Sequence, residues 1–321
     1  IIYSLLFLRM PVITDISPEV LRDRHRLSSQ QINALFGGRI MEEIPEEKAA
    51  CLEKVGEFIR VTDALREAGI EFIPLKGPIL SYRLYGDASV RYFHDLDIMI
   101  DPTEIGHAKT ILENNGYVST ERVWPEDKNR QRRLLRYHHD IIFIHQVKQI
   151  KVELHWRLRH RQGLDDKKAD LLIKQNLSET EYYGRSFKVL DSEMELLYLV
   201  MHGGSHQWGR LSWLHDVIEF MKTHEINEMK FRRLADDFHA GRFIALCNAV
   251  MTEYFPGAVT LPGHTSLPAY MARLTGERIT ADEYPGPFSV KKSIQNLRFS
   301  LIAYPGVTYK FKVIGNIIFN R

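Results

Sequence analysis

Two acidic residues separated by one position, Asp95 and Asp97, have the spacing in this sequence that points most directly to chemistry. They begin a segment, residues 95–100, whose alternating pattern predicts a β-strand. Residues i and i+2 of a strand share a face, so both carboxylates point one way while Leu96, Ile98 and Ile100 point into a core. Two carboxylates held this close together are suited to binding a divalent cation.

A phosphate-binding turn is predicted shortly before the acidic pair. Residues 72–75 have the pattern of a strand that ends at Lys76 and Gly77. Pro78 suits the first turn of a helix, because the N–H that proline lacks would have no partner there. The free N–H groups of such a helix start favour phosphate, and Lys76 adds a positive charge beside them. A phosphate site followed by an acidic pair indicates a site for a metal–nucleotide complex.

Three short motifs resemble the uncharacterised nucleotidyltransferase family of the DNA polymerase beta-like superfamily; they are Leu75-Lys76-Gly77, Leu84-Tyr85-Gly86-Asp87 and Arg91-x-x-x-Asp95-x-Asp97. The resemblance implies an α+β fold with a small mixed sheet flanked by helices. It also implies an acidic triad that holds two Mg²⁺ or Mn²⁺ ions around a nucleoside triphosphate such as ATP. Lys76-Gly77 stands where the superfamily commonly has Gly-Ser.

A third carboxylate is expected on a later strand. Residues 150–156 alternate, with Glu153 and His155 on one face and apolar side chains on the other. In the resembled family a carboxylate on this strand completes the triad, so we assign Glu153 to that role and expect it to help deprotonate the attacking hydroxyl. His155 is either a partner of the metal-binding carboxylates or a structural histidine. Lys76, the Gly77 N–H and Arg91 are expected to hold the phosphates.

A histidine-containing segment lies in the C-terminal half. His202 and His206 are four residues apart, which predicts that they share one helix face, and Arg210 follows them. A zinc-protease motif is excluded, because it requires Glu directly after the first histidine and Gly203 stands there. The resembled family has a similar segment, which implies a back wall of the active cleft next to nucleotide or acceptor. The alternative is buried polar anchoring between helices.

The remaining elements follow from apolar periodicity and from turn and cap residues. The predicted strands are residues 72–75, 95–100, 117–121, 141–144 and 150–156, with a hairpin-like segment at 182–186. The predicted helices are residues 17–36, 46–68, 78–85, 101–116, 231–238 and 243–255, with a charged linker at 162–170. We therefore expect an N-terminal helical arm (1–45), a nucleotidyltransferase domain (46–190) and an α-helical C-terminal domain (191–321).

Composition excludes several classes of protein. The net charge of +2 gives no strong signal for binding DNA. The two cysteines, Cys51 and Cys247, argue against a disulfide scaffold or a structural zinc site and favour a cytoplasmic setting. The apolar residues 1–8 are too few for a membrane helix and lack the basic start of a signal peptide. We expect Met10 to be the natural start, with residues 1–9 as upstream read-through.

Two basic segments each have two interpretations. The first contains five cations, and it is either a solvated surface or a clamp for triphosphate or an anionic acceptor; they are Lys128, Arg130, Arg132, Arg133 and Arg136. The second, residues 289–321, is expected to pack as C-terminal helices, and the alternative is peripheral contact with a membrane surface.

The sequence therefore predicts a metal-dependent nucleotidyltransferase that moves a nucleoside monophosphate from a triphosphate to a hydroxyl and releases pyrophosphate. No residue identifies the acceptor, which belongs to a protein, a peptide, a sugar or RNA. Two alternatives stay open. One is a phosphotransferase acting on glycans, because fukutin-like phosphocholine transferases also place Asp-x-Asp after a Leu-Lys-Gly-like turn. The other is a catalytically silent nucleotide-binding module in which the carboxylates pair with Arg91 and its neighbours.

Overall fold

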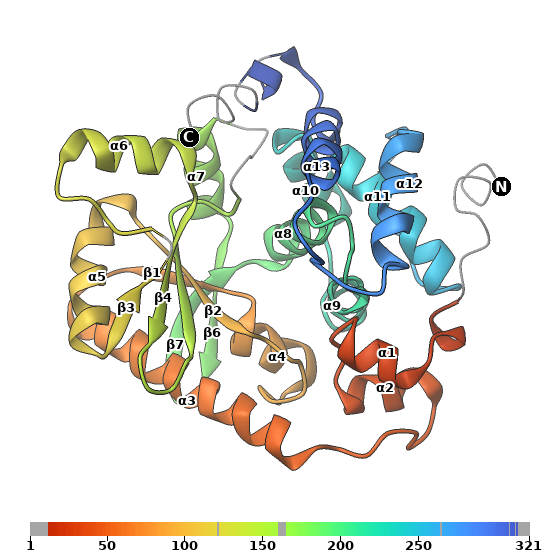
Figure 1. Ribbon diagram of the computed structural model, residues 1–321, viewed down its shortest axis with the longest axis horizontal. Helices are drawn as coiled ribbons and strands as arrows, with labels where there is room; N and C mark the ends of the chain where they lie inside the picture. Colours follow the sequence, from red (N-terminus) through yellow and green to blue (C-terminus); the bar gives the residue numbers. More distant parts are fainter. Residues whose placement is uncertain are drawn as a thin grey trace. The chain divides into compact units, whose positions relative to one another are not determined.

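The structure is a computed structural model that describes residues 12–313 except for 121, 160–164, 264, 308 and 312 (Figure 1). The described chain divides into two compact units. Of the described residues, 43–159 and 170–191 form what we call the sheet unit, and 12–42, the short segment 165–169 and those from 192 onward form the helical unit. The expected start at Met10 and the apolar residues 1–8 lie outside the described residues. The three predicted domains stay a prediction.

A five-stranded mixed sheet forms the centre of the sheet unit, in the order β1-β2-β5-β4-β3. Strands β2 and β5 are parallel, and the other neighbouring pairs are antiparallel. The mixed sheet and its flanking helices confirm the predicted α+β fold class. The strands are β1 (Phe72–Leu75), β2 (Asp95–Ile100), β3 (Tyr117–Ser119), β4 (Asp140–His145) and β5 (Lys151–His155).

One face of this sheet carries the apolar core. Helices α3 (Pro45–Glu67) and α5 (Ile105–Asn114) pack on that face (Figure 1), where Leu96, Ile98 and Ile100 of β2 join the same buried cluster as residues of both helices. Because neighbouring side chains of a strand alternate between faces, Asp95 and Asp97 belong to the opposite face. The alternating side chains of β2 therefore place the apolar core on one face of the sheet and the predicted metal-binding carboxylates on the other.

Other elements of the sheet unit connect or flank the strands. Helix α7 (Asp166–Gln175) corrects the expected linker at 162–170: the helix begins inside it, where the Asp165 carboxylate accepts the backbone N–H of Lys167 at 3.1 Å. The hairpin expected at 182–186 is confirmed as the turn between two strands. The remaining elements are α4 (Gly77–Tyr85), η2 (Pro102–Glu104), α6 (Lys128–Tyr137), β6 (Leu177–Tyr182) and β7 (Arg185–Leu190). Helix α6 holds the first basic segment, whose clamp interpretation stays open.

The helical unit is built around α8 (Ser192–Ser205), which packs against α9 (Leu211–Thr223), α10 (Glu228–Asp237) and α11 (Gly241–Tyr254). The single helix expected over residues 17–36 is wrong. It is interrupted because Arg26 has a left-handed φ of 64° and Ser28 starts a new capping box. The two resulting helices are α1 (Pro18–Asp23) and α2 (Ser29–Phe36); the rest are η1 (Ile13–Asp15), α12 (Ala269–Ile279) and α13 (Val290–Ala303).

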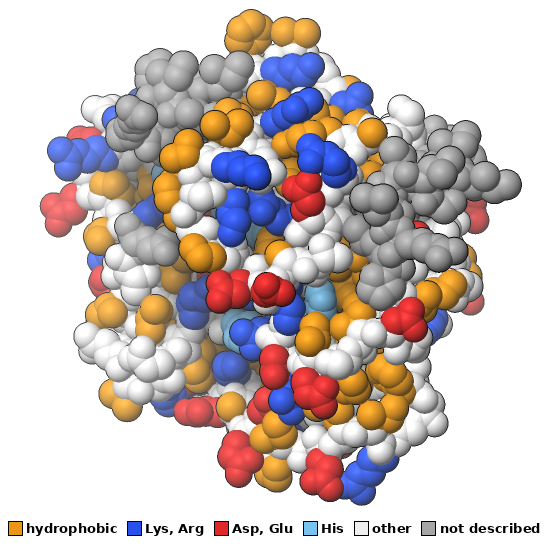
Figure 2. Space-filling model, turned by 45° about the vertical axis from the view of Figure 1, so that its right-hand side comes forward, with side chains coloured by type: hydrophobic (Ala, Val, Ile, Leu, Met, Phe, Trp, Pro, Cys, Tyr) orange, Lys and Arg blue, Asp and Glu red, His pale blue; other side chains and the backbone are white. Residues whose placement is uncertain are grey.

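Charge and apolarity are mixed on the surface. On the face shown in Figure 2, basic, acidic and hydrophobic side chains are interspersed. This agrees with the net charge of +2. Among the described helices, none combines the length and apolarity that crossing a lipid bilayer requires.

Candidate active site

The face of the sheet opposite the core gathers carboxylates and cations. The parallel register pairs Asp97 with Glu153 and Asp95 with Lys151, so these side chains and His155 share that face. Asp97, Glu153 and His155 each offer one ligand atom, and these three atoms lie within 4.8 Å of one another. We call these three residues the acidic cluster. Two of the three predicted acids and the predicted histidine partner are therefore brought together.

Asp97 is the most enclosed acid of the cluster, with a side chain that is 4% exposed. Its carboxylate lies 3.1 Å from the Lys76 ammonium and 2.9 Å from Nε2 of His155. Burial by itself raises the pKa of Asp97, but the Lys76 charge and the hydrogen bond from His155 outweigh it and lower the pKa below its usual value. Asp97 is therefore held as a carboxylate inside the protein.

Glu153 and His155 complete this arrangement. Nε2 of His155 also lies 3.5 Å from Glu153, whose other oxygen is 2.8 Å from the Lys151 ammonium. Burial raises the pKa of Glu153, but its contacts with His155 and Lys151 lower it to about 2. Burial lowers the pKa of His155, but the two carboxylates raise it to about 10. Nδ1 of His155 has no hydrogen-bond partner among the described residues.

Asp95 lies one step along the same face and is more open to solvent, with a side chain that is 31% exposed. It does not belong to the group of three ligand atoms. Lys151 lies 3.2 Å from Asp95 and 2.8 Å from Glu153, so this one ammonium joins the two carboxylates. A divalent cation shared by the predicted triad would have to take the place of Lys151.

The turn between β1 and α4 brings Lys76 to the cluster. Lys76 has φ 51° and ψ −131°, and Gly77 has φ 53°. Positive φ is uncommon for a residue with a side chain, and such backbone strain often marks functional sites. Helix α4 starts at Gly77 with Pro78 in its first turn, so the first N–H groups of the helix lie next to Lys76, as the sequence predicts.

A fourth carboxylate on this face, Asp140, is absent from the sequence prediction. It is the register partner of His155, is 6% exposed, and lies 3.1 Å from Arg122 and 3.3 Å from Nδ1 of His139. Burial raises the pKa of Asp140. Its strand was expected to begin one residue later. The sequence did contain a signal for Asp140. Residues two apart on a strand share a face, so Asp140 shares a face with Ile142, which is the register partner of Glu153.

Among the remaining predicted site residues, Arg91 lies in the sheet unit, and His202, His206 and Arg210 lie in the helical unit. Arg91 is 7% exposed, and its backbone N–H donates to Oγ of Ser81 at 3.1 Å. In the helical unit the rings of His202 and His206 are 4.8 Å apart, as expected for residues four apart on one helix face. Helix α8 ends at Ser205, and the His206 N–H still donates to the His202 carbonyl at 3.2 Å. The Arg210 guanidinium lies over the ring of Trp213. Roles for these four predicted residues in catalysis stay predictions.

The donor set of the acidic cluster fits a divalent cation. Asp97 and Glu153 present carboxylate oxygens, which Mg²⁺ prefers, and His155 adds a nitrogen that can bind a metal only after the imidazolium loses its proton. In the described contacts, the negative charge of the carboxylates is balanced by Lys76, Lys151 and His155. These same cations suit the negative charge of a phosphate. The face can therefore bring metal and phosphate together.

Comparison with known proteins gives one family and several similar folds. The family model described as "Uncharacterised nucleotidyltransferase" matches residues 26–256. ANT(2")-Ia in complex with adenylyl-2"-tobramycin is 12% identical, with 58% of this chain and 97% of that chain covered and a TM-score of 0.42. The lincomycin-bound lincosamide antibiotic adenylyltransferase LnuA is 16% identical, with 53% and 97% covered and a TM-score of 0.38. An antigenic nucleotidyltransferase-like protein from Paracoccidioides brasiliensis is 16% identical, with 56% and 85% covered and a TM-score of 0.34. None of the curated proteins matches the chain.

Proposed function

The chain belongs to the uncharacterised nucleotidyltransferase family, and from this we propose that it moves a nucleoside monophosphate from a nucleoside triphosphate to a hydroxyl acceptor and releases pyrophosphate. The observation that carries the proposal is the acidic cluster, in which Asp97, Glu153 and His155 present ligand atoms within 4.8 Å of one another. In-line phosphoryl chemistry depends mainly on positioning and charge neutralisation, and this face supplies both.

Two divalent cations, Mg²⁺ or Mn²⁺, belong to the proposal. Asp97 and Glu153 would hold them from inside the protein, and Asp95 would add a third carboxylate from its more exposed position. When bound, such ions neutralise phosphate charge and make a coordinated hydroxyl more acidic.

The residues of the chain have separate roles in the proposal. Lys76 and the first N–H groups of α4 bind the triphosphate, with Arg91 as a further proposed contact. In this proposal Glu153 accepts the hydrogen bond of the acceptor hydroxyl and takes its proton. His155 contacts both Asp97 and Glu153, at 2.9 and 3.5 Å, and so fixes the two carboxylates relative to each other. A cytoplasmic setting is part of the proposal, because Cys51 and Cys247 are free thiols.

Thermal unfolding with each of the four triphosphates, with and without Mg²⁺, tests the proposal. A ligand present at 100 times its Kd stabilises the folded state by about 2.7 kcal/mol, so we expect a rise in Tm of several degrees with at least one triphosphate, only with Mg²⁺. Asp97→Asn should abolish the rise. Asp236→Asn, which removes an exposed carboxylate of α10, is the matched control and should keep it. A rise that survives Asp97→Asn would contradict the proposal.

The silent-module alternative is favoured by one observation, the pairing of Asp97 with Lys76 and His155 in the described structure. In that alternative the carboxylates are structural. Asp97→Asn would then lower the free energy of unfolding, and no triphosphate would produce a Mg²⁺-dependent rise in Tm in either protein. The same titration therefore separates a transferase from a structural ion-pair network.

A further inference from the structure

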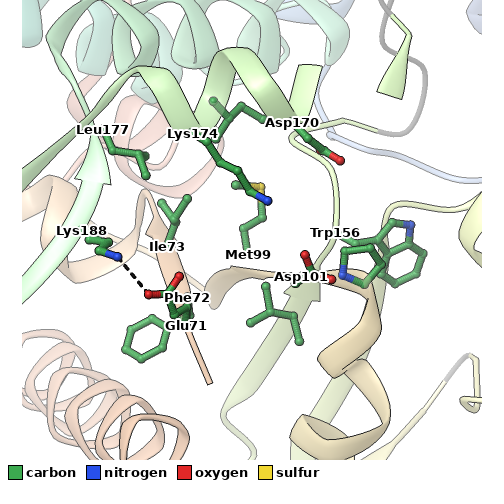
Figure 3. A pocket seen from close by; sticks show the side chains of 13 residues that line it. Glu71, Phe72, Ile73, Met99, Asp101, Trp156, Asp170, Lys174, Leu177 and Lys188 are labelled. Atoms are coloured by element: carbon green, nitrogen blue, oxygen red, sulfur yellow. Dashed lines mark hydrogen bonds and ion pairs between the residues drawn. The ribbon is translucent and has the colours of Figure 1, made fainter. Parts of the chain in front are cut away.

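A pocket of about 400 Å³ lies on the same sheet face as the acidic cluster (Figure 3). Its floor includes Ile73 of β1 and Met99 of β2, which are register partners. Met99 follows Asp97 by two residues on the same strand, about 7 Å further along, and on its other side it pairs with His155. The pocket therefore begins where the acidic cluster ends.

The walls of the pocket come from the part of α7 that belongs to the sheet unit, residues 170–175, and from β6 and β7. Apolar side chains, including Trp156 and Leu177, line it together with the floor. In Figure 3, Lys174 extends from α7 into the pocket toward Ile73 and Met99. The volume of the pocket falls in the range typical of small-molecule sites, which are mostly apolar with a few well-placed polar groups.

The charged side chains around the pocket differ in whether they make ion pairs or hydrogen bonds within the protein. Lys188 is paired with Glu71 at 3.0 Å (Figure 3), and the Asp101 carboxylate accepts the backbone N–H and the hydroxyl of Thr103 at 2.9 and 2.6 Å. Among the described residues, the Lys174 ammonium makes no hydrogen bond or ion pair. The hydrogen bonds from Thr103 lower the pKa of the nearby Asp101, the charge of Lys174 lowers it further, and Asp170 also lines the pocket. A cation that reaches over an apolar floor and makes no ion pair favours an anionic group on whatever binds there.

We infer that this pocket binds the acceptor of the transfer reaction, and that the acceptor is a small molecule with an apolar body and an anionic group, such as a hydroxy carboxylic acid. The inference rests on the proposed function. The apolar body lies on Ile73 and Met99, the anion pairs with Lys174, and the hydroxyl points back along β2 toward Glu153. The pocket is too small for a folded protein or an RNA helix, which narrows the acceptor classes left open by the sequence.

The ligand class is tested with a matched pair of probes. The acid is para-hydroxyphenylacetate, which has an aromatic ring, a hydroxyl and a carboxylate, and the control is its neutral amide. Dissociation constants are measured by ligand-observed NMR on the full chain without nucleotide. We expect the acid to bind about fivefold more tightly than the amide, because one solvent-screened charge contact contributes about that factor to the dissociation constant. Lys174→Met should abolish this preference, and Lys167→Met, on the same helix but outside the pocket, should keep it.

A second variant tests the place of binding. Ile73→Trp adds a large ring to the floor and should abolish binding of both probes, with circular dichroism as the check that the variant is folded. Lys174 is exposed, so its replacement leaves folding intact. Equal binding of acid and amide by the wild type, or the same preference in Lys174→Met as in Lys167→Met, would overturn the inferred ligand class.

Proximity to the acidic cluster is tested with Mn²⁺, which broadens the NMR signals of nearby protons. We expect Mn²⁺ to broaden the ring signals of the bound acid in the wild type but not in Asp97→Asn, which should still bind the probe. Mn²⁺ binding without this broadening would overturn the acceptor role. If Mn²⁺ does not bind but the pocket still prefers the acid, the proposed function is contradicted. The acceptor role, which depends on that function, is then contradicted too, whereas the inferred ligand class of the pocket is still supported.

Discussion

Glu57 offers a quantitative test of how the sheet unit is held together. Its side chain on α3 is 1% exposed, and its carboxylate accepts hydrogen bonds from Arg60, from the Tyr117 hydroxyl at 2.7 Å and from the Lys148 ammonium at 2.6 Å. Tyr117 lies on β3 and Lys148 in the turn between β4 and β5. Glu57 therefore ties a helix of the core to one edge of the five-stranded sheet.

The size of the effect follows from the pKa of Glu57. Burial raises this pKa, but the hydrogen bonds from Arg60, Lys148 and Tyr117 lower it from 4.5 to about 2. At about 1.4 kcal/mol for each pH unit between folded and unfolded pKa, this contributes about 3 kcal/mol to the free energy of unfolding. Because the folded pKa is the lower one, the contribution is complete above pH 4.5 and is lost as the pH falls toward 2.

The assay is urea denaturation of the wild type and Glu57→Gln across this range of pH, followed by tryptophan fluorescence. We expect Glu57→Gln to lower the free energy of unfolding by about 3 kcal/mol at pH 7 and by progressively less as the pH falls below 4.5. Glu53→Gln, one turn earlier on α3 and exposed, is the matched control and should change it by less than about 0.5 kcal/mol. A loss that is the same at low and neutral pH, or no larger than that of the control, would refute this reasoning.

Two further predictions concern the helical unit and the proposed phosphate contact of Lys76. Gly203→Ala should lower the free energy of unfolding by about 3 kcal/mol, because a Cβ there would meet the Trp208 ring at 2.1 Å. Gly56→Ala, in α3 with no atom within 4 Å of the added Cβ, should instead raise it by about 1 kcal/mol, and urea denaturation measures both. Lys76→Met should weaken Mg²⁺-triphosphate binding about tenfold in a calorimetric titration, because it removes one charged phosphate contact. It should not weaken Mn²⁺ binding, because the Lys76 ammonium, 3.1 Å from Asp97, competes with the metal; equal loss of both would contradict the assigned role.

The sequence was sufficient to predict those elements whose structure is determined by a local pattern of residues. Strands β1 and β2 have the predicted bounds, because β1 is a short apolar run that ends at Lys76-Gly77 and the first residues of β2 alternate between acidic and apolar. Alternation also placed Glu153 and His155 on one face. It could not show that Nε2 of His155 lies between Asp97 and Glu153, because that depends on the parallel register of β2 and β5, which are far apart in the chain.

The errors arise where the backbone leaves a regular pattern. Arg26 and Lys76 both have positive φ, which propensity assigns to glycine rather than to residues with long side chains. The first interrupts a predicted helix, and the second turns an expected phosphate ligand toward Asp97. Asp140 was missed because its strand starts one residue before the apolar run. A buried charge at a strand end is read more easily from the register of the sheet than from composition.

The central claim is that Asp97 and Glu153 hold divalent metal together with a triphosphate. Electron paramagnetic resonance of Mn²⁺ with a non-hydrolysable ATP analogue counts the bound ions directly. We expect two ions for each chain in the wild type and in Asp236→Asn, and a loss of bound Mn²⁺ in Asp97→Asn and Glu153→Gln. The same amount of bound Mn²⁺ in all four proteins would contradict the claim.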